Sequence, residues 1–161
     1  MSDVICDTSV LQYLHQLDLL HILPSLATNV FVPAAVVEEI EVGIEHQVDL
    51  PRLKEIEWIR VETPQAITAL PLVADLGPGE AQVLMLALER PGTVALLDDG
   101  LARRVASLLD IPMTGTLGLL LDSKKAGLIS AVKPLLDELQ RLNFRLDADT
   151  RRIVLKLANE N

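Results

Sequence analysis

Aromatic residues and cysteine are scarce in this sequence of 161 residues. Trp, Tyr and Phe make up only 2% of the chain, so the core must be built from Leu, Val, Ile and Ala. Such a core favours a helix-rich or α/β fold over a β-sandwich. The single cysteine, Cys6, excludes an intrachain disulfide framework and leaves no basis for a cysteine-ligated zinc site. The length predicts one domain with its own core.

Targeting and membrane-spanning segments are not visible in the sequence either. The N-terminus has no basic-then-apolar signal, and no uninterrupted apolar run is long enough to span a bilayer. The three histidines share no metal-binding spacing, and the few aromatic residues are too scattered to form a base-stacking platform. We therefore expect no membrane partner and a cytoplasmic location.

Basic residues are few, and their distribution is uneven. The net charge of −9 argues at face value against nucleic-acid binding. Residues 1–99 hold 4 Lys/Arg and 16 Asp/Glu, whereas residues 100–161 hold 10 Lys/Arg and 7 Asp/Glu. Many of the acidic residues are expected on a solvated surface. The crowding of the others in the first part of the chain leads to a more specific hypothesis.

Short apolar runs alternate with helical patterns along the chain. Strands are expected at 4–6, 30–32, 58–61, 93–97 and 111–114, with 58–61 at an edge. Helices are expected from Thr8 or Ser9, at 33–45, at about 80–89, after residue 100, and near 116–126, 130–142 and 147–158. The run 93–97 is continuously apolar, as in a parallel strand that is covered on both faces. The alternation predicts an α/β fold with an open parallel sheet.

Carboxylates follow two of the predicted strands. Asp7 comes after the strand at 4–6, and Asp98 and Asp99 come after the strand at 93–97. A single such aspartate is most simply a helix cap. Two strands that end this way favour a shared site, because the functional crevice of an open α/β sheet lies beyond the carboxyl ends of its strands. We therefore expect these two strands to be adjacent.

Two glutamates are predicted to point inward from helices. Glu38, Glu41 and Glu45 share one outer face of the helix at 33–45, whereas Glu39 lies on the apolar side and needs a partner or a metal. Glu80 precedes an apolar face at the start of the next helix. Stabilisation by the helix dipole is an alternative role for Glu80.

The inward and strand-end carboxylates together form a candidate metal site. Oxygen ligands of this kind suit Mg²⁺ or Mn²⁺. A bound ion would polarise a phosphoryl oxygen and activate water for in-line attack. The candidate metal ligands are Asp7, Glu39, Glu80, Asp98 and Asp99.

Several short motifs occur together in the order and spacing of a known family. They are Asp7-Thr8-Ser9, the run Val32–Ile40, the run Leu76–Ala81, the pair Asp98-Asp99 followed by Ala102-Arg103, and the run Gly115–Leu120. Each motif is weak alone, but the set resembles PIN domains over about residues 3–145. The resemblance implies a three-layer α/β/α fold with a central parallel sheet, a Mg²⁺ or Mn²⁺ site, and ribonuclease activity on single-stranded RNA.

The resemblance also implies roles for individual residues and partners. Asp7, Glu39, Glu80 and Asp99 match the acidic catalytic ligands, and Asp98 could replace or assist Asp99. Thr8 or Ser9 is expected to hold a water or phosphate near the metal. Many PIN domains are toxins that are held by an antitoxin protein. Residues 1–145 would form the nuclease domain, and the helix in 146–161 would belong to it or serve as an interaction segment.

Nearby cations are needed to offset repulsion between an acidic pocket and RNA. The candidates are Arg103 and Arg104, after the aspartate pair, and Lys124. Aliphatic residues are abundant in 130–158, which predicts a homodimer or higher oligomer, or antitoxin docking.

Other functions fit the sequence less well. Gly100 and Gln82 depart from the family pattern, which leaves open a catalytically inactive PIN-like module that binds RNA or protein. A haloacid-dehalogenase-type phosphatase would need a second Asp where Ser9 stands. A receiver domain would need a lysine after its last strand, and residues 112–116 contain none. A dinucleotide-binding fold would need a Gly-rich turn after its first strand, which is absent.

Overall fold

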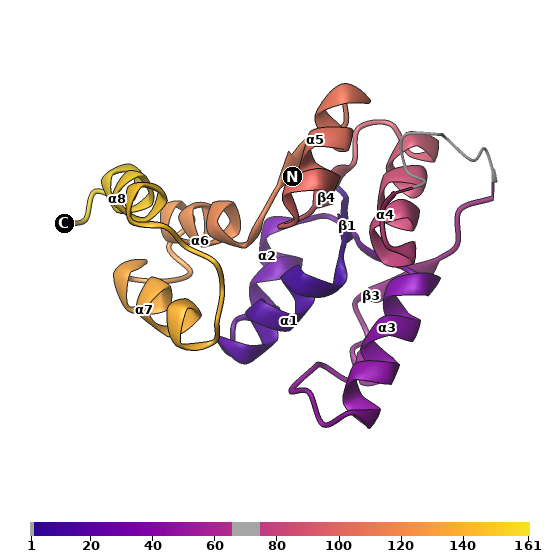
Figure 1. Ribbon diagram of the computed structural model, residues 1–161, viewed down its shortest axis with the longest axis horizontal. Helices are drawn as coiled ribbons and strands as arrows, with labels where there is room; N and C mark the ends of the chain where they lie inside the picture. Colours follow the sequence, from indigo (N-terminus) through magenta and orange to yellow (C-terminus); the bar gives the residue numbers. More distant parts are fainter. Residues whose placement is uncertain (1, 66–74) are drawn as a thin grey trace.

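A parallel sheet flanked by helices forms the body of the protein (Figure 1). The computed structural model describes residues 2–65 and 75–161. All four strand pairings are parallel, in the order β3-β2-β1-β4-β5, which confirms the predicted three-layer α/β/α architecture. The strands are β1 (Val4–Cys6), β2 (Val30–Pro33), β3 (Ile59–Glu62), β4 (Val94–Leu96) and β5 (Met113–Thr114).

The helices follow the predicted order, with shifted ends and some additions. The helix expected at 33–45 begins one residue later, because Pro33 ends β2 and precedes the helix in extended conformation. The additions are η1, α2 and η2, which the sequence patterns did not predict. The α-helices are α1 (Thr8–Gln16), α2 (Leu23–Leu26), α3 (Ala34–Glu45), α4 (Pro78–Glu89), α5 (Gly100–Leu108), α6 (Thr116–Lys125), α7 (Lys133–Arg141) and α8 (Ala148–Leu157); the 3-10 turns are η1 (Leu20–Ile22) and η2 (Leu53–Glu55).

Burial along the strands explains their sequences. Every residue of β1 and β2 is buried, as expected for central strands that are covered on both faces. Strand β3 is only partly covered, and Val61 is 55% exposed, which agrees with its position at the edge of the sheet. The sheet core is mostly aliphatic, as the scarcity of aromatic residues predicted, with Phe31 of β2 as a buried aromatic member.

Two apolar clusters stabilise the chain. The larger one surrounds the sheet, and the smaller one lies among α6, α7 and α8, which form a separate group on the left of Figure 1. Leu119 of α6 belongs to the first cluster and Leu120 to the second. The rings of Tyr13 and Phe144 pack edge to face with centroids 4.9 Å apart, which connects α1 to the second cluster.

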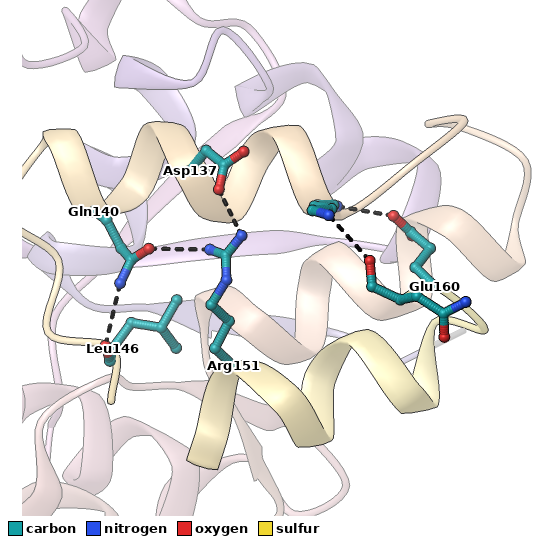
Figure 2. A network of polar contacts seen from close by, with 7 residues as sticks. Asp137, Gln140, Leu146, Arg151 and Glu160 are labelled. Carbon is teal, nitrogen blue, oxygen red and sulfur yellow. Dashed lines mark hydrogen bonds and ion pairs between the residues drawn. The ribbon is translucent and has the colours of Figure 1, made fainter. Parts of the chain in front are cut away.

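Polar contacts hold the C-terminal helices together. Figure 2 shows Arg151 of α8 donating to Asp137 and Gln140 of α7. The carboxylate of Glu160 accepts hydrogen bonds from the backbone N–H of Val132 (2.7 Å) and Lys133 (3.0 Å) at the start of α7. These bonds, together with a contact from a lysine ammonium, lower the pKa of Glu160 to about 2.

One side of helix α8 packs against the second apolar cluster, and the other side is exposed. Val154 is buried in the second cluster and Leu155 packs against it, whereas Ile153 and Leu157 are 56% and 60% exposed. Within residues 2–65 and 75–161, no helix is long and apolar enough to cross a membrane.

Candidate active site

The carboxyl ends of β1 and β4 lie side by side. Cys6 pairs with Leu96 in parallel register, and the N–H of Asp7 donates to the carbonyl of Leu96 at 3.1 Å. This pairing confirms that the two strands followed by aspartates are adjacent. The edge of the sheet therefore brings the chain at Asp7 close to the chain just after β4.

Asp7 is the most deeply buried carboxylate of the site. It is 4% exposed, and its Oδ1 has no hydrogen-bond partner within residues 2–65 and 75–161. Its backbone is placed to cap α1, but its side chain makes no capping hydrogen bond, so the simple helix-cap role does not describe it. Burial raises its pKa to about 7; the N–H of Thr8 partly opposes this, and the charges of Glu80, Glu39 and Asp98 add to it.

Glu39 points inward from α3, as its helical position predicted. One carboxylate oxygen accepts a hydrogen bond from the Thr8 hydroxyl (2.6 Å), and the other accepts from the N–H of Gly79 (2.9 Å). A Cβ at residue 79 would lie 2.6 Å from a Glu39 oxygen, so any larger residue there would displace the Glu39 carboxylate from this position. The start of α1 and the start of α4 thus hold the Glu39 carboxylate from two sides.

Glu80 and Asp99 lie next to each other across the site. Glu80 stands in the first turn of α4. Burial raises its pKa first, and the negative charge of Asp99 raises it further, while the N–H of Gly77 opposes the shift. Asp99 is exposed and caps α5, because its Oδ2 accepts from the N–H of Ala102 at 2.9 Å.

Asp98 is directed toward the start of α6. Its Oδ1 accepts from the backbone N–H of Thr116 (2.8 Å) and its Oδ2 accepts from the Thr116 hydroxyl (2.7 Å). Thr116 is fully buried. Thr116 was not predicted as a partner of Asp98, although it lies in the motif Gly115–Leu120 and is a hydroxyl residue at a predicted helix start.

Several helices begin at this edge of the sheet: α1, α3, α5 and α6 each follow a strand closely, and α4 begins beside Glu39. Each helix start carries a partial positive charge and free N–H groups, which stabilise nearby anions. The carboxylates of Asp98, Asp99 and Glu39 each accept at least one of these N–H groups. The arrangement lets several acidic side chains gather here in a folded protein.

Comparison with known families decides the identity of the fold. The sequence profile of the PIN domain matches residues 3–160, nearly the whole chain. The chain belongs to the PIN-domain family. No curated protein matches the sequence.

PIN domains are generally nucleases, and their acidic sites typically use divalent metals. Among the described residues, no group of three or more His, Cys, Asp or Glu side chains is placed so that it could hold a metal ion. The chemistry of the donor set nevertheless fits a hard divalent cation, because the buried Oδ1 of Asp7 has no hydrogen-bond partner among the described residues, and the charges of Glu80, Glu39 and Asp98 act on the same carboxylate. A cation at this point would satisfy that oxygen and offset the mutual repulsion.

The candidate substrate-binding residues of this PIN domain lie in different surroundings in the structure. Thr8 holds Glu39, and Ser9 is half-buried beside it. Arg103 donates to the carbonyl of Leu97 at 2.9 Å, close to the acidic edge, whereas Arg104 is exposed on α5.

Lys124 does not join the acidic group in this structure. Its ammonium donates to the carbonyl of Ala158 and to Glu160 (2.9 Å), at the C-terminal end of α8.

The structure also shows the surroundings of the two residues that depart from the family pattern. Gln82 accepts a hydrogen bond from the N–H of Ala35 at 2.9 Å and so ties α4 to the start of α3, while Gly100 is exposed with open space around it.

Proposed function

We propose that this PIN domain is a divalent-metal-dependent endoribonuclease that hydrolyses phosphodiester bonds of single-stranded RNA. The observation that carries the proposal is the buried Asp7 carboxylate at the edge of the sheet. One of its oxygens has no hydrogen-bond partner among the described residues, and burial together with the charges of Glu80, Glu39 and Asp98 raises its pKa. A buried, charged and unpaired group is costly to a fold, and such groups concentrate at functional sites.

Asp7, Glu39, Glu80 and Asp99 are the residues that would hold Mg²⁺ or Mn²⁺. When bound, the ion would polarise a phosphoryl oxygen and lower the pKa of a water ligand. The chain supplies the orientation of the donors. Glu39 is fixed by hydrogen bonds from α1 and α4, and Asp99 is fixed at the start of α5.

Arg103 and Arg104 are the candidates for the positive charge that the acidic edge requires. Arg103 is held close to the end of β4 by its bond to Leu97, and Arg104 is exposed one residue later. An acidic site attracts an RNA phosphate only if nearby cations offset its own charge. These two arginines therefore fit the role of drawing the substrate backbone toward the site.

The experiment is cleavage of a fluorescent single-stranded RNA by the native protein with Mn²⁺, with Mg²⁺ and with EDTA. Asp7→Asn keeps the size of the side chain and removes the charge. We expect it to lower cleavage by roughly a hundredfold or more, since even outer partners of metal ligands contribute about 10–100-fold. Mn²⁺ binding measured by calorimetry should fall in parallel.

Glu38→Gln is the matched control. It removes one negative charge from an exposed position next to Glu39 and should leave cleavage unchanged. Single-stranded DNA and double-stranded RNA of the same sequence test the choice of substrate. Cleavage that persists in EDTA, or that is equal in native protein and Asp7→Asn, would exclude this site as the source of activity. Metal-independent RNA binding without cleavage would instead favour the inactive module.

The same proposal extends to the cellular role. It includes action in the cytoplasm as the toxin of a toxin–antitoxin pair and a homodimer or higher oligomer as the working form. The exposed side chains of Ile153 and Leu157 on α8 support an interaction there, because they lie one helical turn apart and are uncovered. The candidate partner would be a second copy of this chain or an antitoxin protein.

A further inference from the structure

The two adjacent aspartates after β4 have different environments. Both oxygens of Asp98 are engaged by Thr116, through its backbone N–H (2.8 Å) and its hydroxyl (2.7 Å). In Asp99, one oxygen accepts from Ala102, and the carboxylate lies against Glu80. Each Asp98 oxygen is thus held by Thr116, whereas Asp99 is held by one oxygen at the start of α5 and its carboxylate lies against Glu80.

The surroundings of Asp98 are closely packed. A Cβ on Gly115 would lie 2.7 Å from Oδ1 of Asp98, 3.0 Å from Nη1 of Arg103 and 3.0 Å from the carbonyl oxygen of Leu97. Arg103 also donates to that carbonyl at 2.9 Å. The start of α6 therefore packs closely against the chain after β4, and its backbone N–H stabilises the Asp98 charge.

We propose that Asp98 is a positioning residue that acts through Thr116, and that Asp99 alone of the pair supplies a carboxylate to the metal. Asp98 fixes the backbone after β4 against the start of α6, so that the next residue presents its carboxylate to Glu80. The metal half of this inference rests on the proposed function; the link between Asp98 and Thr116 does not.

A pair of Asp→Asn substitutions separates the two roles. Asn at position 98 can still accept from the Thr116 N–H, and the Thr116 hydroxyl can rotate to accept from the new amide. Asn at position 99 still caps α5, because Asn caps helices about as well as Asp. Both substitutions therefore keep the local hydrogen bonds and remove only a charge. Only at position 99 should the charge be needed.

The experiment measures Mn²⁺ affinity by calorimetry and RNA cleavage for the native protein, Asp98→Asn, Asp98→Ala and Asp99→Asn. Asp98→Asn should stay within about threefold of the native affinity, while Asp99→Asn should lose about tenfold or more, in line with the loss of a ligand. Asp98→Ala should lose cleavage that Asp98→Asn retains. This rescue by the conservative variant distinguishes hydrogen bonding from charge.

Equal losses of Mn²⁺ affinity in Asp98→Asn and Asp99→Asn would overturn the inference, because Asp98 would then be a ligand. A second measurement covers the case in which the native protein binds no Mn²⁺ and the proposed function fails. Urea unfolding in EDTA is compared for Asp98→Ala, Thr116→Val and the double variant. If Asp98 acts through Thr116, the double variant loses clearly less stability than the two single losses combined. Additive losses would overturn the positioning role whatever the metal result.

Discussion

Asp7→Asn tests the charge at the end of β1 in the metal-free protein. Asp7 is 4% exposed, and burial raises its pKa from 3.8 to about 7. Between these two pH values the folded chain keeps a proton that the unfolded chain has lost. The resulting stabilisation is fully present below about pH 4 and is lost as the pH rises through about 7.

The magnitude follows from the pKa change. A difference of about 3 pKa units corresponds to about 4 kcal/mol, at about 1.4 kcal/mol for each unit. Asn cannot ionise, so the stability of Asp7→Asn relative to the native protein should rise by about 3–4 kcal/mol between pH 4 and pH 8. For a domain of this length, that corresponds to a rise of roughly 6–16 °C in relative Tm.

The assay is urea unfolding of both proteins in EDTA at several pH values from 4.5 to 8. Subtracting the free energy of unfolding of the native protein from that of the variant at each pH cancels most of the contribution from other titrating groups. Glu38→Gln, at an exposed position of α3, is the control for the loss of one negative charge. The difference in free energy of unfolding between Asp7→Asn and the native protein could instead stay constant to within about 0.5 kcal/mol over this pH range, as for ordinary surface substitutions. That result would refute a raised pKa of Asp7 in the folded protein.

Three further predictions follow from the site and its surroundings. Gly79→Ala should weaken Mn²⁺ binding in calorimetry, because its Cβ would lie 2.6 Å from a glutamate oxygen of the site, whereas Gly100→Ala, with nothing within 4 Å, should bind as the native protein does. Arg104→Ala should weaken RNA binding and reduce the slope of its salt dependence by about 1, measured by fluorescence anisotropy. Lys124→Ala should lower the urea midpoint of unfolding and leave RNA affinity unchanged. Weaker RNA binding in Lys124→Ala but not in Arg104→Ala would contradict these roles. Ile153→Glu should lower the mass measured by light scattering if α8 mediates self-association, and an unchanged oligomer would exclude that face.

The parts of the site that depend on local pattern could be predicted from sequence. The burial of the strand before Asp7, the paired acids after β4 and the inward direction of Glu39 each follow from periodicity within a few residues. Parallel topology then brings the strand ends together. These local features are sufficient to predict the acidic edge from the sequence.

The parts that depend on distant partners could not be predicted. Asp98 and Asp99 look equivalent in sequence, and only the contact to Thr116, 18 residues away, separates them. Lys124 looks available for RNA, but its partner Glu160 lies 36 residues later. The segments η1 and α2 are too short for a helical period to register.

The hydrogen bonds from Val132 and Lys133 to Glu160 can form only after the C-terminal segment has been synthesised. The last strand of the sheet, β5, ends at Thr114, whereas the second apolar cluster needs Val154 and Ala158. The N–H of Val132 meets its carboxylate partner only 28 residues later in the chain. At roughly 5–20 residues per second, that interval is about 1–6 s.

The sheet and its acidic edge can therefore assemble while α6 and α7 still lack their cover. During that time the apolar side chains of Leu120, Leu136 and Leu139 have no α8 to pack against. Until α8 docks, these side chains are open to non-native contacts, because an incompletely packed intermediate exposes apolar surface.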